Sequence, residues 1–352
     1  MKKIKVLIAD DSAFMRKLLA DIIASDDELE VVALARNGED ALRQIASHKP
    51  DVVTLDVEMP VMDGLTALEK IMAEHPLPVV MLSAFTDKGT ASTLKALEKG
   101  AVDFVTKPGG TISPGTAAMS SEIISKLKMA ARISRKNIRI TSAPLDLAAP
   151  PVKKIALPEK TERVRSLVAI GTSTGGPKAL HEVMRRFSHH HNAALLIVQH
   201  MPPGFTKSLA QRLDTASVYT VKEAEDGDEV KGGCAYLAPG DYHMEINEEK
   251  GQLTIKLNQS SQVNGHRPSV DVLLKSAART TAPKVGVIMT GMGSDGAIGM
   301  KMMKDAGAIN IGESEETCVI YSMPKAAKQL GALDYETPLY RIAEVIEKVV
   351  SK

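Results

Sequence analysis

The chain has 352 residues, a length typical of two domains, and its net charge of +1 creates no strong field that would attract nucleic acid. Aromatic residues make up 3% of the chain and Trp is absent, which argues against a surface that stacks bases. Two cysteines exclude a disulfide framework, and no apolar run reaches the ~18 residues of a membrane span. We therefore expect a cytoplasmic protein that inserts no segment into a membrane.

From Lys5 to about Arg135, short apolar runs alternate with amphipathic stretches. The apolar runs predict strands at Val6–Ala9, Val31–Ala35, Val52–Asp56, Val79–Leu82 and Phe104–Thr106. The amphipathic stretches predict helices at Ala13–Ile23, Gly38–Ser47, Gly64–Glu74 and Gly89–Lys99. This order of β/α units indicates a doubly wound parallel sheet, in which ligands bind at the carboxyl ends of the strands.

Polar residues stand at the carboxyl ends of these predicted strands. They are Asp10, Asp11, Asp56, Ser83 and Lys107. Carboxylates that converge on one edge repel each other unless a cation joins them, and oxygen ligands of this kind suit Mg²⁺. Asp56 could then act as a phosphoryl acceptor, with Lys107 neutralising the developing charge. Any one of these residues alone fits a solvated loop or a helix cap, but their combination favours a phosphoryl site.

This part of the chain, residues 4–122, resembles the receiver domain of response regulators. The motifs that carry the resemblance are Ile8-Ala9-Asp10-Asp11-Ser12, Leu55 to Gly64, Leu82-Ser83-Ala84 and Val105-Thr106-Lys107-Pro108. The resemblance implies a five-stranded flavodoxin-like fold with Asp56 as the phospho-acceptor. It also implies that Asp10, Asp11 and Asp56 hold Mg²⁺, that Ser83 contacts the phosphoryl group and that Lys107 pairs with it.

The same resemblance bears on two further residues. The bond before Pro108 is often cis in this family, and the sequence permits that here. Phe104 occupies the position of the family's switch aromatic, although a plain core residue would explain it equally well.

A linker follows the first domain. Ile123–Ile133 has the pattern of the end of a last helix, and from Lys136 to Arg165 the periodicity dissolves. Four prolines interrupt this stretch: Pro144, Pro150, Pro151 and Pro158. We therefore divide the chain into a first domain at 4–122, a helix end and linker at 123–162, and a second domain at 163–352.

The alternation of apolar runs and amphipathic stretches resumes in the second domain. Strands are predicted at Leu167–Ile170, Ala193–Val198, Val218–Thr220, Ala235–Leu237, Leu253–Leu257, Val285–Met289 and Ala308–Ile311. Helices are predicted at Pro177–Arg186, Phe205–Asp214, Ser269–Arg279, Gly296–Asp305 and Pro338–Val350. The pattern indicates a second α/β unit, Rossmann-like, with a mostly parallel sheet and some antiparallel or hairpin pieces.

The stretch Leu167–Pro177 opens this domain with a strand, a glycine-rich turn and a helix start. Gly171, Ser173 and Gly175 match G-x-S-x-G, the pattern of a nucleophile elbow. We expect amides at the helix start to stabilise an anion near Ser173. A turn with a buried or capping serine is an alternative. A nucleotide-binding turn is disfavoured, because it needs G-x-G-x-x-G and an acidic residue after the second strand, where this chain has His200.

A nucleophilic serine needs a base and a group that orients the base. His200 follows the second predicted strand, which places it at the same edge of the sheet as Ser173. Asp295 lies in the glycine-rich loop Gly291–Gly296, whose backbone amides could stabilise an oxyanion. Each residue alone fits an ordinary loop histidine or helix cap. The order Ser–His–Asp differs from that of the α/β-hydrolase fold, so a different fold is expected.

The second domain, about residues 163–350, resembles the CheB family of chemotaxis protein-glutamate methylesterases. The motifs are Ile170 to Gly176, Gln199 to Thr206, Ala238 to Asp241, Gly265 to Asp271 and Thr290 to Gly296. The resemblance implies Ser173 as nucleophile, His200 as base and Asp295 as the group that orients it. It also implies the Met292 amide as an oxyanion donor, and Thr174 is placed to help position His200. The role of His266 stays open.

The combined resemblance implies a phosphorylation-activated hydrolase that demethylates glutamate methyl esters, and deamidates glutamines, on methyl-accepting chemoreceptors. A chemotaxis histidine kinase would supply the phosphoryl group, Mg²⁺ would serve the receiver, and the esterase reaction would need no cofactor. We expect a monomer whose receiver gates the active site. Two alternatives stay open: a response regulator with a non-enzymatic output, such as nucleic-acid binding, and a metabolic esterase for small molecules.

Overall fold

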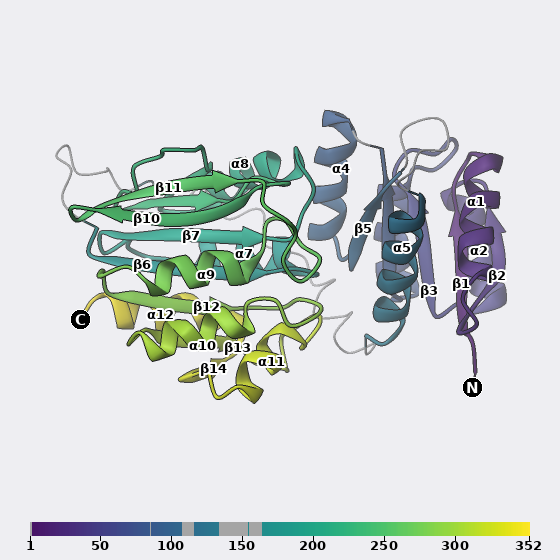
Figure 1. Ribbon diagram of the computed structural model, residues 1–352. Helices are drawn as coiled ribbons and strands as arrows, with labels where there is room; N and C mark the ends of the chain where they lie inside the picture. Colours follow the sequence, from purple (N-terminus) through teal and green to yellow (C-terminus); the bar gives the residue numbers. More distant parts are fainter. Residues whose placement is uncertain (1, 85, 108–115, 134–153, 155–163) are drawn as a thin grey trace. The chain divides into compact units, whose positions relative to one another are not determined.

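The computed structural model describes residues 2–84, 86–107, 116–133, 154 and 164–352 (Figure 1). For residues 87, 88 and 116–118 it describes only the backbone. The chain divides into two compact units, 1–145 and 146–352, which are described separately below.

The first unit contains a parallel sheet of five strands with helices between successive strands. The strands are β1 (Ile4–Ala9), β2 (Leu29–Ala35), β3 (Val52–Asp56), β4 (Val79–Ser83) and β5 (Asp103–Thr106), in the order β2-β1-β3-β4-β5. The helices are α1 (Ala13–Ala24), α2 (Gly38–His48), α3 (Gly64–Glu74), α4 (Asp87–Glu98) and α5 (Thr116–Ala131). The doubly wound parallel sheet expected from the sequence is confirmed, and β3 and β4 are buried along their whole length.

Capping side chains explain where four of these helices begin. Ser12, Asn37, Asp63 and Thr86 each accept a hydrogen bond from the backbone amide three residues further on. Such a bond satisfies an amide that has no partner inside the helix, and each is worth about 1 kcal/mol. Each of these four helices therefore starts directly after a strand or a short loop, which keeps the strand ends at one edge of the sheet.

The second unit contains a parallel sheet of seven strands and a separate antiparallel hairpin. The sheet order is β14-β13-β12-β6-β7-β9-β8, with β6 (Ser166–Thr172), β7 (Ala193–Gln199), β8 (Thr220–Glu223), β9 (Cys234–Leu237), β12 (Lys284–Ile288), β13 (Ile309–Glu313) and β14 (Tyr335–Thr337). The hairpin pairs β10 (His243–Glu249) with β11 (Gln252–Asn258). This arrangement confirms the predicted mostly parallel sheet with a hairpin piece.

Among the described residues of the second unit, five helices lie between these strands, and a sixth, α12, follows the last strand. They are α7 (Gly176–Met184), α8 (Phe205–Ala216), α9 (Val270–Ala278), α10 (Ala297–Asp305), α11 (Met323–Gln329) and α12 (Ile342–Val350), with a 3₁₀ turn η1 (Leu339–Arg341) before α12. Helix α9 packs against β6 and β7 and also against β10 of the hairpin (Figure 1). Strands β6 and β7 lie at the centre, and every one of their residues is buried.

Several sequence-based expectations for this unit were wrong or incomplete. The strand expected at Val218–Thr220 lies at 220–223, because Val218 and Tyr219 are buried in the core without belonging to the strand. The sequence pattern missed β10, whose residues alternate but carry charge, and the short elements β14 and α11. The expected helix at Pro338–Val350 begins with the 3₁₀ turn η1.

Two other expectations concern residues that the structure does not describe. The bond before Pro108 and most of the linker between Lys136 and Arg165 lie outside the described ranges. Within the described ranges, no helix has the length and apolar character needed to cross a membrane.

Candidate functional site

In the first unit, the sheet brings three aspartates together at one edge. Asp10 and Asp11 follow β1 and Asp56 ends β3, and carboxylate oxygens of the three residues lie within 4.8 Å of one another. Lys107, which follows β5, places its Nζ 2.8 Å from Asp10 Oδ2 and 2.7 Å from Asp56 Oδ2. Three carboxylates and one ammonium leave a net charge of −2 at this point, which a divalent cation would balance.

The electrostatics of this cluster reflect its burial. Burial raises the pKa of Asp56 to about 6, although the ammonium of Lys107 opposes this rise and Asp10 adds to it. Burial also disfavours the charge on Lys107, but its hydrogen bonds to the two carboxylates outweigh this and raise its pKa. The chemistry of the donor set, carboxylate oxygens from three residues, fits Mg²⁺.

Ser83 and Phe104 are buried close to this edge of the sheet. The Ser83 hydroxyl accepts a hydrogen bond from Thr93 Oγ1 at 2.6 Å and donates toward the carbonyl of Gly89 at 3.4 Å. Thr93 was not identified from the sequence, since a threonine inside a helix carries no signal of its own. The ammonium of Lys126 lies 5.3 Å from the centre of the Phe104 ring.

In the second unit, Ser173 and His200 extend from the ends of the adjacent strands β6 and β7. Thr172 and Gln199 are paired across these strands, and the His200 amide donates to the Thr172 carbonyl at 3.1 Å. The Ser173 amide donates to the carbonyl of Thr290 at 3.0 Å, which ties the serine to the end of β12. The predicted placement of Ser173 and His200 at one edge is therefore confirmed.

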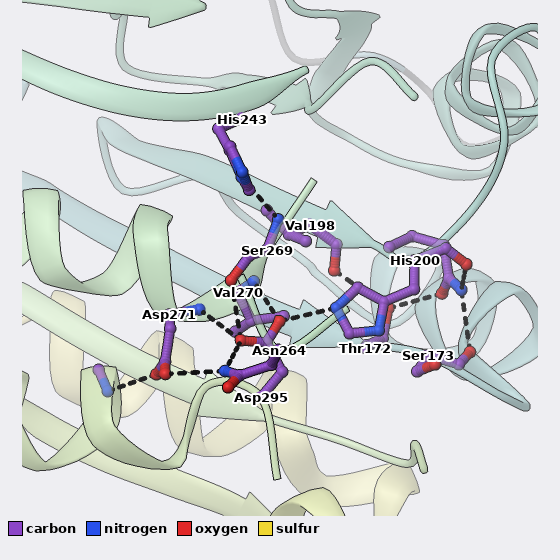
Figure 2. A network of polar contacts seen from close by, with 12 residues as sticks. Thr172, Ser173, Val198, His200, His243, Asn264, Ser269, Val270, Asp271 and Asp295 are labelled. Atoms are coloured by element: carbon purple, nitrogen blue, oxygen red, sulfur yellow. Dashed lines mark hydrogen bonds and ion pairs between the residues drawn. The ribbon is translucent and has the colours of Figure 1, made fainter. Parts of the chain in front are cut away.

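The predicted contact between His200 and Asp295 is also present. His200 Nε2 lies 2.8 Å from Asp295 Oδ2, and the side chains of both residues are almost fully buried. His200 Nδ1 is buried and has no hydrogen-bond partner among the described residues. Figure 2 shows the imidazole ring with Asp295 on one side and Ser173 on the other. The ring nitrogen that is left for a reaction partner is thus Nδ1.

Asp295 is the most heavily hydrogen-bonded carboxylate of this site (Figure 2). Its donors are His200 Nε2, Asn264 Nδ2, Ser269 Oγ and the amides of Val270 and Asp271, at distances of 2.7 to 3.2 Å. Burial opposes the charge on Asp295, but these bonds, led by the one from His200, hold its pKa well below the usual range. Asp295 is therefore a fixed anion that accepts the hydrogen bond from His200 Nε2.

A tight turn touches both His200 and Asp295. Asn264 and Gly265 have φ angles of 54° and 79°, and Val263 and His266 exchange two backbone hydrogen bonds across them. Positive φ at both central residues is what an Asn-Gly turn provides. Asn264 binds Asp295, and the His266 ring stacks on His200 with centroids 3.7 Å apart. The role of His266 stayed open from the sequence, and Asn264 was not identified there, although the Asn-Gly pair is itself a turn signal.

The expectation that amides at the start of α7 stabilise an anion is wrong for three of the first four residues. The Gly176 amide donates to the carbonyl of Ser173 at 2.8 Å, and the Ala179 amide donates to Gly175. Pro177 has no amide hydrogen. In the loop Gly291–Gly296, the Gly291 amide donates to the carbonyl of Ile320 at 3.1 Å, and Met292 is partly exposed, at 37%.

Thr174 and Thr290 connect the serine loop to the loop after β12. Thr290 Oγ1 donates to the Thr174 carbonyl at 3.0 Å, and the Thr290 amide donates to Glu313 Oε2 at 2.8 Å. Glu313 is fully buried, and burial raises its pKa to about 7. Glu313 was not identified from the sequence, because a single glutamate at the end of a strand resembles a solvated residue.

Both units match models of known families. Residues 168–346 match the CheB methylesterase model, and residues 6–112 match the response regulator receiver domain model.

Curated proteins resemble the chain over nearly its full length. A protein of Syntrophomonas wolfei named protein-glutamate methylesterase/protein-glutamine glutaminase 1 is 49% identical, and the alignment covers 100% of this chain and 99% of that protein. A protein of Pyrococcus horikoshii named protein-glutamate methylesterase/protein-glutamine glutaminase is 48% identical, with 99% and 94% covered.

A solved structure resembles the second unit. The crystal structure of the Thermotoga maritima CheB methylesterase catalytic domain is 45% identical and has a TM-score of 0.50. The match covers 52% of this chain and 96% of that structure.

Proposed function

The chain belongs to the CheB methylesterase family, and we propose that it hydrolyses glutamate methyl esters, and deamidates glutamines, on chemoreceptors under the control of its receiver. The observation that carries this proposal is the hydrogen bond between His200 Nε2 and Asp295 Oδ2, at the sheet edge where Ser173 begins the turn after β6. A nucleophile, a base and an orienting anion are the parts that acyl transfer needs.

In the proposed reaction, Ser173 Oγ attacks the ester carbon while His200 Nδ1 takes the hydroxyl proton. Asp295 stabilises the imidazolium that forms, because it is already held as an anion by its hydrogen bonds. The backbone amide of Met292 stabilises the oxyanion, and Thr174 helps to position His200. His200 then protonates the methoxide oxygen as its bond to carbon breaks, and methanol leaves. Water attacks the acyl-enzyme while His200 takes its proton, and the glutamate is released as Ser173 Oγ regains a proton from His200. With a glutamine substrate, ammonia leaves in place of methanol. The ester hydrolysis needs no cofactor.

In the receiver, Asp56 is the proposed phosphoryl acceptor, and a chemotaxis histidine kinase is the proposed donor. Asp10, Asp11 and Asp56 would hold Mg²⁺, which supplies charge neutralisation at the phosphoryl oxygens. Lys107 is already paired with Asp56 and would shift to the phosphoryl group. Ser83 would contact that group through its hydroxyl.

We assign residues 4–122 to the receiver, 123–162 to the end of its last helix and the linker, and 163–352 to the catalytic domain. The proposed substrate is a side chain on a large chemoreceptor. A receiver domain that partly covers Ser173 would therefore keep this substrate out of the active site. Phosphorylation of Asp56 would relieve this inhibition. We place the enzyme in the cytoplasm as a monomer, with chemoreceptors and the kinase as its partners and without nucleic acid.

The test is methanol release from membranes that carry methylated receptors, compared with turnover of p-nitrophenyl acetate. The proposal predicts rapid methanol release and slow turnover of the small ester. Rapid turnover of p-nitrophenyl acetate without methanol release would instead identify a metabolic esterase.

A further inference from the structure

We propose that Gln199 is a positioning residue that fixes the separation of Ser173 and His200, an inference that rests on the proposed Ser–His mechanism. Gln199 is the last residue of β7, stands directly before His200, and is 2% exposed. Its side chain runs from β7 toward β6, the strand that carries Ser173. It contributes no proton to the reaction, so its effect would be exerted through the other two residues.

Both polar atoms of the Gln199 side chain have partners, at the end of β6, at Ser173 and at His200. Oε1 accepts a hydrogen bond from Thr172 Oγ1 at 2.7 Å. Nε2 donates to the carbonyl of Ser173 at 2.9 Å and to the carbonyl of His200 at 3.1 Å. One amide group thus binds the backbone of the nucleophile and the backbone of the base, and the Thr172 hydroxyl fixes its orientation.

These partners explain why the residue is a glutamine. Two backbone carbonyls need two hydrogens, and a primary amide supplies both from a single nitrogen. A glutamate of the same size would place a carboxylate oxygen against both carbonyls, and a buried acceptor without a donor is costly. A methionine would fill a similar volume but would leave the His200 carbonyl without this donor.

Gly176 shows how closely the turn fits the amide. A Cβ on Gly176 would lie 1.9 Å from Gln199 Oε1, so no side chain is accommodated there. The Gly176 amide donates to the same Ser173 carbonyl that Gln199 binds, at 2.8 Å. The carbonyl of the nucleophile is therefore held from two directions, by the α7 start and by β7. This arrangement limits movement of Ser173 relative to His200.

The experiment compares Gln199→Met with Asn310→Leu. Asn310 is a matched control, because it is a fully buried amide on β13 whose Nδ2 also donates to two backbone carbonyls, those of Met300 and Ala332. The readouts are kcat and KM for receptor demethylation, normalised to titrated active sites, and the rate at which a fluorophosphonate labels Ser173. Thr172→Val removes only the hydroxyl that orients the Gln199 amide, and it decides the question if Gln199→Met does not fold.

For Gln199→Met we expect kcat and the labelling rate to fall about 10- to 100-fold with KM unchanged, since misplaced reacting groups slow chemistry rather than binding. Thr172→Val should show a smaller fall of the same kind. Asn310→Leu should lower the melting temperature but keep kcat per active site. Wild-type kcat in both Gln199→Met and Thr172→Val, or an equal loss in Asn310→Leu, would overturn the proposal. Labelling of wild-type Ser173 without receptor demethylation would refute the proposed substrate and still leave the Gln199 comparison decisive.

Discussion

Asp295 binds His200 through Nε2, and this contact leaves Nδ1 as the ring nitrogen that can serve Ser173. In the serine proteases that define this kind of triad, the carboxylate binds Nδ1 and Nε2 faces the serine. In this chain the two ring nitrogens of His200 have exchanged these roles, since Nε2 binds the carboxylate. What matters for the chemistry is that the anion holds one nitrogen protonated, so that the other is a base.

Asp295→Asn tests this assignment of the two nitrogens. Both oxygens of Asp295 accept hydrogen bonds, so the NH₂ group of an asparagine would face donors in either orientation of the amide. If the NH₂ group faces His200, Nε2 must accept a hydrogen bond instead of donating one. Nδ1 would then carry the proton and could not act as base, so we expect activity to fall about 10³- to 10⁴-fold. Steady-state methanol release measures this loss, and ¹⁵N NMR of the imidazole reports the tautomer. An unchanged tautomer with unchanged activity would contradict the assignment.

Asp56→Asn is expected to abolish labelling by acetyl phosphate, because an amide is not a nucleophile for phosphoryl transfer. Wild-type labelling should require Mg²⁺ and should disappear with EDTA. Lys107→Met is expected to leave Asp56 as the labelled residue but to slow labelling, since the ammonium pairs with that carboxylate. Peptide mapping of the phosphoprotein checks both results, and equal labelling of wild type and Asp56→Asn would place the acceptor at another residue.

Glu313 predicts how the stability of the second unit depends on pH. Its folded-state pKa of about 7 lies above its ordinary value of 4.5, because burial disfavours the charge. Its contribution to stability is therefore complete below pH 4.5 and is lost as the pH rises through 7. The difference between these two pKa values corresponds to a loss of about 3 kcal/mol in the free energy of unfolding. Calorimetry should show that the stability of Glu313→Gln relative to wild type increases between pH 5 and pH 8. Curves of stability against pH that run parallel for the two proteins would contradict the prediction.

The proposed inhibition by the receiver can be tested with a fragment that lacks it. Lys154 ion-pairs with Asp214 and donates to the Tyr219 carbonyl, so the fragment should begin at residue 152 to keep these contacts. It should release methanol faster than the unphosphorylated full chain by about tenfold or more and should not respond to acetyl phosphate; tenfold corresponds to ~1.4 kcal/mol. A fragment no faster than the full chain would indicate positive activation or recruitment.

The sequence predicts the ends of the strands that carry the site residues well, because these buried parallel strands are continuous apolar runs and polar residues directly follow them. Asp10, Asp56 and Lys107 were identified in this way, as were Ser173 and His200. Residues of this kind lie close together because the carboxyl ends of parallel strands meet at one edge of the sheet.

Residues that act across the fold could not be found in the same way. Gln199 and Glu313 bind backbone groups of distant segments, and such contacts leave no local pattern in the sequence. Asn264 reaches Asp295 from a turn 31 residues earlier. The roles of these side chains depend on how β6, β7 and β12 are juxtaposed, which the sequence shows only as three separate apolar runs.

The most direct test of the account is methanol release from methylated receptor membranes by Ser173→Ala and Ser166→Ala. Both serines are largely buried and lie at or just beyond opposite ends of β6, so each change removes one buried hydroxyl from the same strand, but only Ser173 lies beside His200. The account predicts that Ser173→Ala releases no methanol above the spontaneous rate while Ser166→Ala retains wild-type release that rises with acetyl phosphate. Methanol release by Ser173→Ala at the wild-type rate would contradict it.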